Sequence, residues 1–189
     1  MTSDQGGRPR DESIDARVLQ ACRELLTEVG YEGTSVRGVA ARAGVGRASI
    51  LRRWPSKAEL VAHSFFTLPP DEGWTDRTDR TDWIAGVVEQ THRFYSDAEV
   101  QAALPGLIVA YQQDPELRAA IWHKYTSPDA QRFATKSESS IADADILFVL
   151  LVCGGVAMYA ATIADLEYTP EVRSRVARLL QTATRPRHR

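Results

Sequence analysis

Six cationic side chains lie close together between Gly30 and His63, a stretch that contains only two carboxylates, Glu32 and Glu59. The chain as a whole, in contrast, has a formal net charge of −2. A local excess of Arg and Lys on a weakly acidic chain indicates a surface that binds the phosphates of a nucleic acid. The six cations are Arg37, Arg42, Arg47, Arg52, Arg53 and Lys57.

Patterns typical of catalytic sites do not occur in the chain: there is no nucleophile elbow, phosphate loop, HExxH motif or pair of closely spaced cysteines. Gly44-Val45-Gly46 resembles the start of a dinucleotide-binding turn, but Ser49 stands in place of its last glycine and no strand precedes it. The histidines and cysteines are scattered, at His63, His92, His123 and His188 and at Cys22 and Cys153. We therefore expect no enzyme, no metal site and no cofactor.

The cations follow the pattern of two short helices joined by a glycine turn. Thr34 and Ser35 supply side-chain oxygens that cap a helix start, and apolar residues follow at helical spacing. Gly44 stands where a helix would end in a left-handed cap. A second helix then runs from Gly46 to Trp54 and carries arginines outward. Residues 34–54 thus predict a helix-turn-helix, a unit whose second helix enters the major groove of DNA.

Flanking elements brace this motif. Apolar residues at helical spacing predict a helix from Asp11 to Val29, which Gly30 ends. On the other side Pro55 breaks the chain, and Ser56 caps a helix that begins at Lys57. A cation at a helix N-terminus is disfavoured by the helix dipole. The presence of Lys57 at this position therefore indicates a phosphate-binding site, since helix N-termini bind phosphates.

The stretch GYEGTSVRGVAARAGVGRASILRRWPSKAEL, residues 30–60, resembles the DNA-binding domain of the TetR (tetracycline-repressor-like) transcriptional regulators. The resemblance runs without gaps from about Ile14 to Leu60. It includes positions that a bare helix-turn-helix pattern would not require, which makes it specific. These positions are Gly30, Thr34, Ala40, Gly44, Val45, Ser49 and Lys57.

Two positions depart from the pattern of that family. The family commonly has a helix-capping serine where this chain has Gly46, and a phosphate-binding tyrosine where it has Leu51. The aromatic residue that follows in the family is matched by Trp54. Loss of the tyrosine hydroxyl implies that Arg52, Arg53 or Lys57 provides more of the phosphate contact.

The resemblance implies a sequence-specific, DNA-binding transcriptional regulator that binds a palindromic operator as a homodimer. It further implies a repressor that a small apolar or aromatic ligand releases from DNA. Because the first ten residues are polar and unlike a signal peptide, we expect a cytoplasmic protein. The expected DNA-binding residues are Thr34, Ser35, Arg37, Gly46, Arg47, Ala48, Ser49, Arg52, Arg53 and Lys57.

Composition divides the chain into four parts. Residues 1–11 predict a disordered arm, residues 12–64 the helix-turn-helix domain, residues 65–82 a polar linker, and residues 83–184 a helical domain for ligand binding and dimerisation. Helical patterns, interrupted by Pro105-Gly106 and by prolines at helix starts, continue to about Thr182. No strand pattern occurs, so the predicted fold class is all-α.

Residues 146–164 form an uncharged, almost wholly apolar run that is long enough to span a membrane. Two adjacent glycines and flanking acidic residues instead favour a buried helix that pairs with a second subunit. The alternative that stays open is a membrane-associated or adaptor protein without a DNA role. In the resembled family the last two helices form the dimer interface. The expected dimer residues are Val152, Gly155, Tyr159, Val172, Val176 and Leu179.

Aromatic residues are frequent in the predicted C-terminal domain, where the resembled family has a ligand pocket between the middle helices. Apolar cavities with a few polar groups bind small molecules. Most of these aromatic side chains would also suit an ordinary core. The expected ligand-binding residues are Trp83, Phe94, Tyr95, Tyr111, Trp122, Tyr125, Phe148 and Met158.

Overall fold

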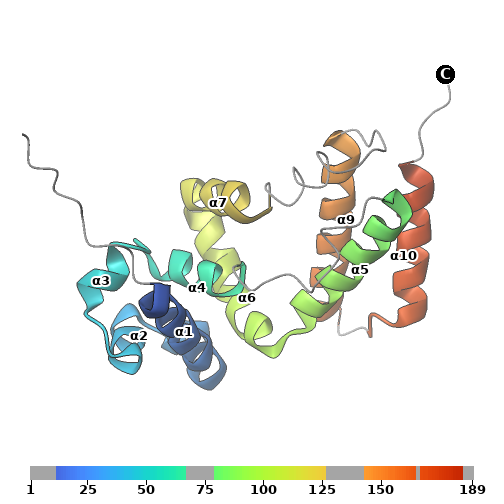
Figure 1. Cartoon of the computed structure of the whole chain (residues 1–189). Coiled ribbons are helices and arrows are strands. Elements are labelled where there is room, and N and C mark those ends of the chain that lie inside the picture. Colours follow the sequence, from blue (N-terminus) through green and yellow to red (C-terminus); the bar gives the residue numbers. More distant parts are fainter. Residues whose placement is uncertain (1–11, 67–78, 127–142, 165–166, 185–189) are drawn as a thin grey trace, which may run out of the picture.

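The structure, a computed structural model of the chain, describes residues 12–66, 79–126, 143–164 and 167–184. Within these ranges all regular secondary structure is helical, which confirms the predicted all-α fold (Figure 1). The predicted arm at 1–11, most of the 65–82 linker and residues 127–142 of the predicted helical domain lie outside the described residues.

Four helices form the N-terminal part: α1 (Glu12–Gly33), α2 (Val36–Ala43), α3 (Arg47–Leu51) and α4 (Lys57–Phe66). Helix α1 buries most of the apolar face that its periodicity predicts: Val18, Cys22 and Leu26 are fully buried, whereas Val29 near its end is 50% exposed. At Gly30 the backbone has φ 68° and ψ −177°, so the regular helix breaks where expected. One further turn then continues to Gly33.

The remaining helices are α5 (Arg80–Ser96), α6 (Ala98–Gln113), α7 (Pro115–Ile121), the short π-helix η1 (Trp122–Thr126), α9 (Asp143–Thr162) and α10 (Pro170–Ala183). Acidic caps start three of them; the Asp97 carboxylate, for example, accepts a hydrogen bond of 2.8 Å from the Glu99 N–H. Pro105 lies inside α6, which runs from Ala98 to Gln113 as one helix, so the interruption predicted at Pro105-Gly106 is wrong.

Two hydrophobic clusters organise the molecule, and they do not follow chain order. Helices α6 and α7 contribute Val100, Leu107 and Ile121 to the same cluster as α1–α4. Helix α5, which precedes them, packs instead with α9 and α10. Figure 1 shows this division: α6 and α7 lie beside α1 and α4, while α5, α9 and α10 form the other end of the molecule. The chain passes between the two clusters at Asp97.

Polar contacts hold α10 against α5 near both of its ends. Near the C-terminal end, the Arg80 guanidinium donates to the Gln181 carbonyl oxygen at 3.0 Å and to the Thr184 hydroxyl at 2.7 Å. Near the N-terminal end, Arg173 Nε lies 2.9 Å from Glu89 Oε1. Because α5 and α9 pack against each other as well, the three helices form one unit within a single chain.

Candidate nucleic-acid interface

A capped turn between α2 and α3 forms the corner of the helix-turn-helix. The Ser35 hydroxyl accepts a 3.1 Å hydrogen bond from the Gly38 N–H and thereby caps α2. Gly44 ends that helix in the left-handed conformation, with φ 66° and ψ 36°, and Val45 donates back to the Ala40 carbonyl oxygen. Glycine suits this position because residues with a side chain rarely adopt a positive φ. Helix α3 begins after Gly46, without a side-chain cap.

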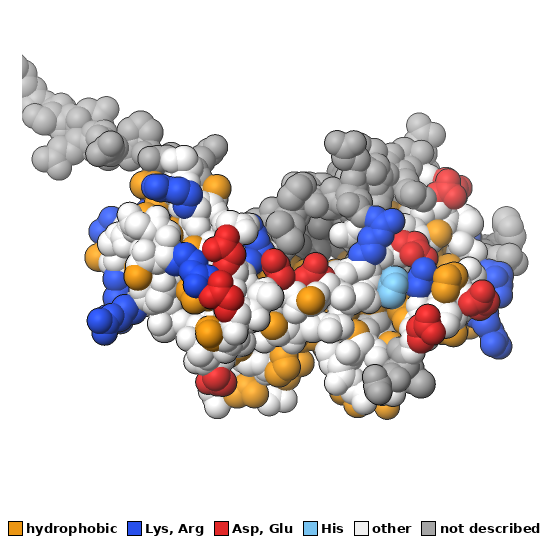
Figure 2. Space-filling model, turned by 90° about the horizontal axis from the view of Figure 1, so that it is seen from below, with side chains coloured by type: hydrophobic (Ala, Val, Ile, Leu, Met, Phe, Trp, Pro, Cys, Tyr) orange, Lys and Arg blue, Asp and Glu red, His pale blue; other side chains and the backbone are white. Residues whose placement is uncertain are grey.

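Three arginines around this corner are exposed: Arg37 on α2, Arg47 at the first position of α3, and Arg52 just after it. In the part of the chain that the structure describes, no ion pair involves any of them. Gly46 and Ala48 are exposed beside them. Figure 2 shows Lys and Arg side chains at the end of the molecule that carries α2 and α3. The geometry therefore provides a cationic surface that is open to a large anionic partner.

Arg42, the remaining cation of α2, faces α1 instead. Its guanidinium forms two hydrogen bonds with the Glu28 carboxylate, at 2.7 and 2.6 Å. This pairing holds the pKa of Glu28 below its usual value. Its charge is therefore balanced within the protein, in agreement with its absence from the expected DNA-binding residues.

Arg53 and Ser49, which the sequence pattern directs outward, are connected to the protein interior. Arg53 Nε lies 2.6 Å from Asp15 Oδ1, and both side chains are less than one fifth exposed. The Arg53 guanidinium also donates to the Ser49 hydroxyl at 2.6 Å. Asp15 could have signalled this contact, because it lies one turn before Val18 on the buried side of α1, where a carboxylate needs a partner.

Thr34 is almost fully buried, at 2% exposure, and its hydroxyl donates to the Gly30 carbonyl oxygen at 2.7 Å. It connects the break in α1 to the start of α2. Ser35 is exposed beside it. The threonine hydroxyl therefore stabilises the turn, while the serine lies at the surface.

Lys57 lies at the start of α4, where the Ser56 hydroxyl accepts a 3.0 Å hydrogen bond from the Glu59 N–H. The Lys57 ammonium donates to the Tyr31 carbonyl oxygen at 3.0 Å and lies 4.0 Å from the centre of the Tyr31 ring. The side chain is half-buried, so its ammonium has a defined position next to the N-terminus of α4. Such a position suits a phosphate contact.

The expected ligand-binding residues do not gather at one place. Trp83 is buried among α5, α9 and α10, whereas Phe94 packs against the N-terminal cluster. Trp122 and Phe148 are 37% and 44% exposed. Met158 is half-buried on α9, and the side chain of Tyr125 lies outside the described part of the structure.

Tyr95 and Tyr111 come closest to a polar site inside the fold. The Tyr111 hydroxyl is buried and has no hydrogen-bond partner among the described residues. Burial raises its pKa, and the nearby hydroxyls of Tyr31 and Tyr95 raise it further. Tyr31 and Tyr111 pack against the cluster of α1–α4, and Tyr95 packs against the cluster of α5, α9 and α10.

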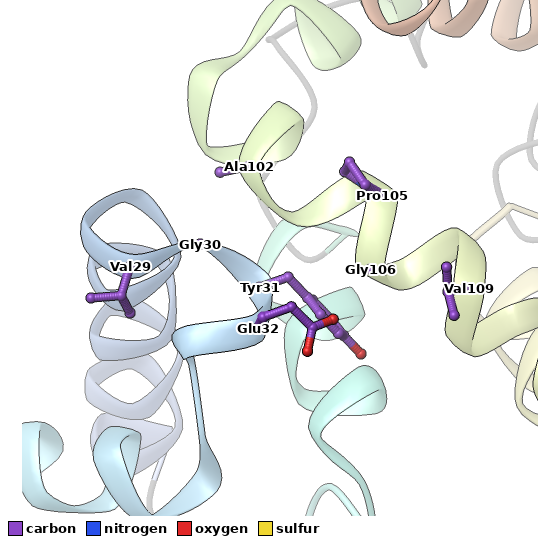
Figure 3. Close-up of a pocket in the computed structure, with 8 residues that line it drawn as sticks. All are labelled: Val29, Gly30, Tyr31, Glu32, Ala102, Pro105, Gly106 and Val109. Atoms are coloured by element: carbon purple, nitrogen blue, oxygen red, sulfur yellow. The ribbon is translucent and has the colours of Figure 1, made fainter.

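A shallow hollow lies between the end of α1 and α6 (Figure 3). Tyr31 and Glu32 line it from α1, and Gly106 lines it from α6. None of the expected ligand-binding residues lines this hollow. The other lining residues are Val29, Gly30, Ala102, Pro105 and Val109.

Helix α9 exposes a continuous apolar stripe at four-residue spacing. Leu147, Leu151 and Tyr159 are 44%, 56% and 55% exposed, and Gly155 lies between them. A Cβ atom added to Gly155 would contact nothing within 4 Å, so a second helix could approach closely there. Ile163 continues the stripe just beyond α9, with 67% exposure.

On α10 the expected dimer residues Val172 and Leu179 are exposed, at 42% and 66%. Val176 and, on α9, Val152 are instead partly buried against the cluster of α5, α9 and α10. By length and composition, residues 145–162 of α9 could cross a membrane, and 22% of that window is buried in the fold. Such a helix is weak evidence for a membrane protein, because core helices of soluble proteins pass the same test.

Comparison with protein families gives a match to the bacterial regulatory proteins of the tetR family over residues 18–63. The chain is 38% identical over 65 residues to YdeS of Bacillus subtilis, an uncharacterized HTH-type transcriptional regulator; the alignment covers 34% of this chain and 33% of that protein. It is 30% identical over 127 residues to the DNA-binding transcriptional repressor TetR of Mycobacteroides abscessus, covering 66% of each.

The matches to curated relatives such as YdeS span only about a third of the length of those proteins. Among solved structures, a TetR transcriptional regulator from Rhodococcus sp. RHA1 superposes with a TM-score of 0.65 at 20% sequence identity. That superposition covers 90% of this chain and 96% of the other. The likeness in fold therefore continues through the helices beyond the N-terminal domain.

Proposed function

Because the chain belongs to the TetR family of bacterial regulatory proteins, we propose that it regulates transcription by binding a specific duplex DNA sequence through α2 and α3. The observation that carries this proposal is the set of exposed arginines Arg37, Arg47 and Arg52 around the helix-turn-helix corner, none of which is in an ion pair with another described residue. Helices α1 and α4 hold this corner in place through a shared core. A packed corner that presents exposed guanidinium groups suits phosphate and base contacts.

Within this surface, we assign base contact to the start of α3. Arg47 occupies its first position, and the first residues of a recognition helix reach base edges. Arg37 and Arg52 lie on either side and suit phosphate contacts, as do the exposed Ser35 hydroxyl and the Lys57 ammonium. Arg53 and Ser49 act indirectly, because their contacts with each other and with Asp15 set the orientation of α3.

We propose that the protein works as a homodimer. One helix-turn-helix offers few contacts, whereas two that are related by symmetry can bind the two halves of a palindrome. The apolar stripe of α9, with Val172 and Leu179 of α10, is a surface that the single chain leaves uncovered. A second copy would cover each stripe with an identical one, as a two-fold interface requires.

The exposed apolar stripe of α9 would also suit the alternative function, that of a membrane-associated protein. A purified protein that stays dimeric without detergent would contradict a membrane role. A chain that partitions into vesicles and binds no duplex would contradict the regulator. We expect the first result and a cytoplasmic location, because a charged corner that selects a DNA sequence needs access to DNA.

We further propose that a small apolar or aromatic molecule releases the protein from DNA, which makes it a repressor. The Mycobacteroides abscessus relative, named as a repressor, supports this direction. The place that suits such a ligand best is near Tyr95 and Tyr111, where the buried Tyr111 hydroxyl has no hydrogen-bond partner among the described residues. A ligand that offers one acceptor to that hydroxyl would remove the cost of its burial.

Selection of bound sequences from a pool of random duplexes tests the proposed function directly. We expect enrichment of an inverted repeat, because each subunit of a symmetric dimer would bind one half. A single unrepeated site would contradict the dimer, and no enrichment at low salt would contradict specific DNA binding. Binding of the selected duplex can then be titrated with a panel of hydrophobic ligands, of which at least one should lower its affinity.

A further inference from the structure

The Tyr31 ring lies directly on the backbone of α6 at Gly106. A Cβ atom built on Gly106 would overlap three atoms of the Tyr31 ring, so only glycine allows this contact. Figure 3 shows both residues at the hollow between α1 and α6. Arg23 of α1 adds an ion pair with Glu99 of α6, at 3.7 Å. Helix α6 is therefore seated on α1 through a contact that a single methyl group would disturb.

Tyr31 also contacts Lys57, which belongs to the proposed DNA-binding surface. The carbonyl oxygen of Tyr31 accepts a hydrogen bond from the Lys57 ammonium, and the ring lies beneath that ammonium at 4.0 Å. An ammonium has three N–H groups. One is directed to the carbonyl oxygen and one faces the ring, which leaves a donor for a phosphate.

We propose that Tyr31 is a positioning residue for Lys57, and that its contact with Gly106 makes the affinity for DNA depend on the position of α6. This inference rests on the proposed DNA-binding function. When α6 stays on Tyr31, the ring and the carbonyl hold the Lys57 ammonium at the N-terminus of α4. When α6 shifts, the ring loses its support, and Lys57 loses its fixed position.

The path from the rest of the molecule to this contact is short. Helix α6 joins α5 through Asp97, which ends one helix and caps the next. Helix α5 belongs to the cluster with α9 and α10. A movement of that cluster relative to the N-terminal one therefore acts on α6 first, and Gly106 transmits it to Tyr31.

A test without DNA uses thermal unfolding of four proteins: wild type, Gly106→Ala, Tyr31→Ala and the double variant. With Tyr31 present, the added methyl group collides with the ring, so Gly106→Ala should lower Tm. With Tyr31→Ala, the collision is gone and alanine is the better helix former, so the same change should raise Tm. The reversal of sign is the expected result. Equal shifts in both backgrounds would overturn the contact.

The link to Lys57 is tested with duplex DNA, either the selected operator or a random duplex at low salt. Lys57→Ala should lower affinity and reduce the salt slope by about one, the loss of one phosphate contact. Tyr31→Leu should reproduce most of that loss, because leucine supports no cation–π contact. Tyr31→Phe is the matched control: it keeps the ring and should bind like wild type.

The decisive comparison combines the changes. In the Lys57→Ala background, Tyr31→Leu should cause little further loss of affinity, because Tyr31 acts through Lys57. If wild type and Tyr31→Phe bind DNA but Tyr31→Leu and Lys57→Ala give additive losses, the positioning role is overturned while the regulator stands. If wild type binds no duplex, the proposed function fails and this proposal fails with it.

Discussion

Asp15 of α1 and Arg53, two residues after the end of α3, form an ion pair with 2.6 Å between Oδ1 and Nε, and both side chains are largely buried. Since Arg53 also donates to the Ser49 hydroxyl, this ion pair connects α1 to the middle of α3. Helix α3 has only five residues, too few for a stable helix on its own. Its orientation therefore depends on contacts such as this one.

Removing one partner of this pair should destabilise the domain without removing a DNA contact. We expect Asp15→Asn to lower the free energy of unfolding by about 1–3 kcal/mol, because a largely buried guanidinium would lose its charged acceptor. Chemical denaturation measures this loss. Glu28→Gln is the matched control: it also removes a carboxylate that pairs with an arginine, but at an exposed site, and its effect should be much smaller. Equal losses would contradict the structural role of Asp15.

Arg47 should determine base preference. Arg47→Ala should weaken the selected operator by about 1–3 kcal/mol and relax selection at one position of each half-site. It should leave binding to random duplexes less affected. Competition binding against both duplexes measures the ratio. Arg118, an exposed arginine on α7, provides a control that removes the same charge far from the corner. An equal loss of affinity for the operator and for random DNA would indicate that Arg47 contacts a phosphate and not a base.

The stripe on α9 should hold the dimer together. Leu151→Glu places a charge in the middle of it, and we expect the protein to become monomeric and to lose affinity for a palindrome. Val109→Glu is the control, because Val109 on α6 is exposed to a similar extent, 51% against 56%. Light scattering after gel filtration gives the mass of each variant. A monomer after both changes, or after neither, would contradict an interface on α9.

The helices and the corner were predictable because their signals are local. Ser35 and Gly44 act on their own backbone neighbours, so a pattern of capping residues is enough to locate them. The departure at Gly46 was also predictive, since α3 starts without a side-chain cap. The inward direction of Arg53 leaves no signal within its own segment, because its partner Asp15 comes from an earlier helix and only that carboxylate on the buried side of α1 points to it. Helical spacing decides which face a residue occupies, but not whether another helix covers that face.

The grouping of α6 with α1–α4 is a second feature that the sequence did not reveal. Composition shifts at 65–82 suggest a boundary in the chain, whereas packing is decided by contacts such as the Tyr31 ring on Gly106. A glycine after a proline predicts a break in the helix by local rules. Here Gly106 instead allows the Tyr31 ring to approach the backbone of α6 closely. That role depends on which residue packs against the glycine, and the local sequence around Gly106 does not reveal it.

Both cysteines should be unreactive in the folded protein and should make it sensitive to alkali. Burial raises the pKa of Cys22 from 9.0 to about 11 and that of Cys153 to about 12. Because the folded state retains these protons more tightly than the unfolded chain, the stabilisation is complete below pH 9. It is lost as the pH rises from 9 through 11 and 12.

Thiol titration with a disulfide reagent at pH 8 should therefore detect no reactive cysteine in the folded protein and two after denaturation. The free energy of unfolding should fall above pH 9, on the order of 2 kcal/mol for Cys22 by pH 11. Cys22→Ala should flatten that part of the pH profile, since alanine does not titrate. Rapid labelling of Cys22 at pH 8 would show that the contact between α1 and α4 opens readily. It would contradict the inference that these two helices hold α2 and α3 in a fixed position.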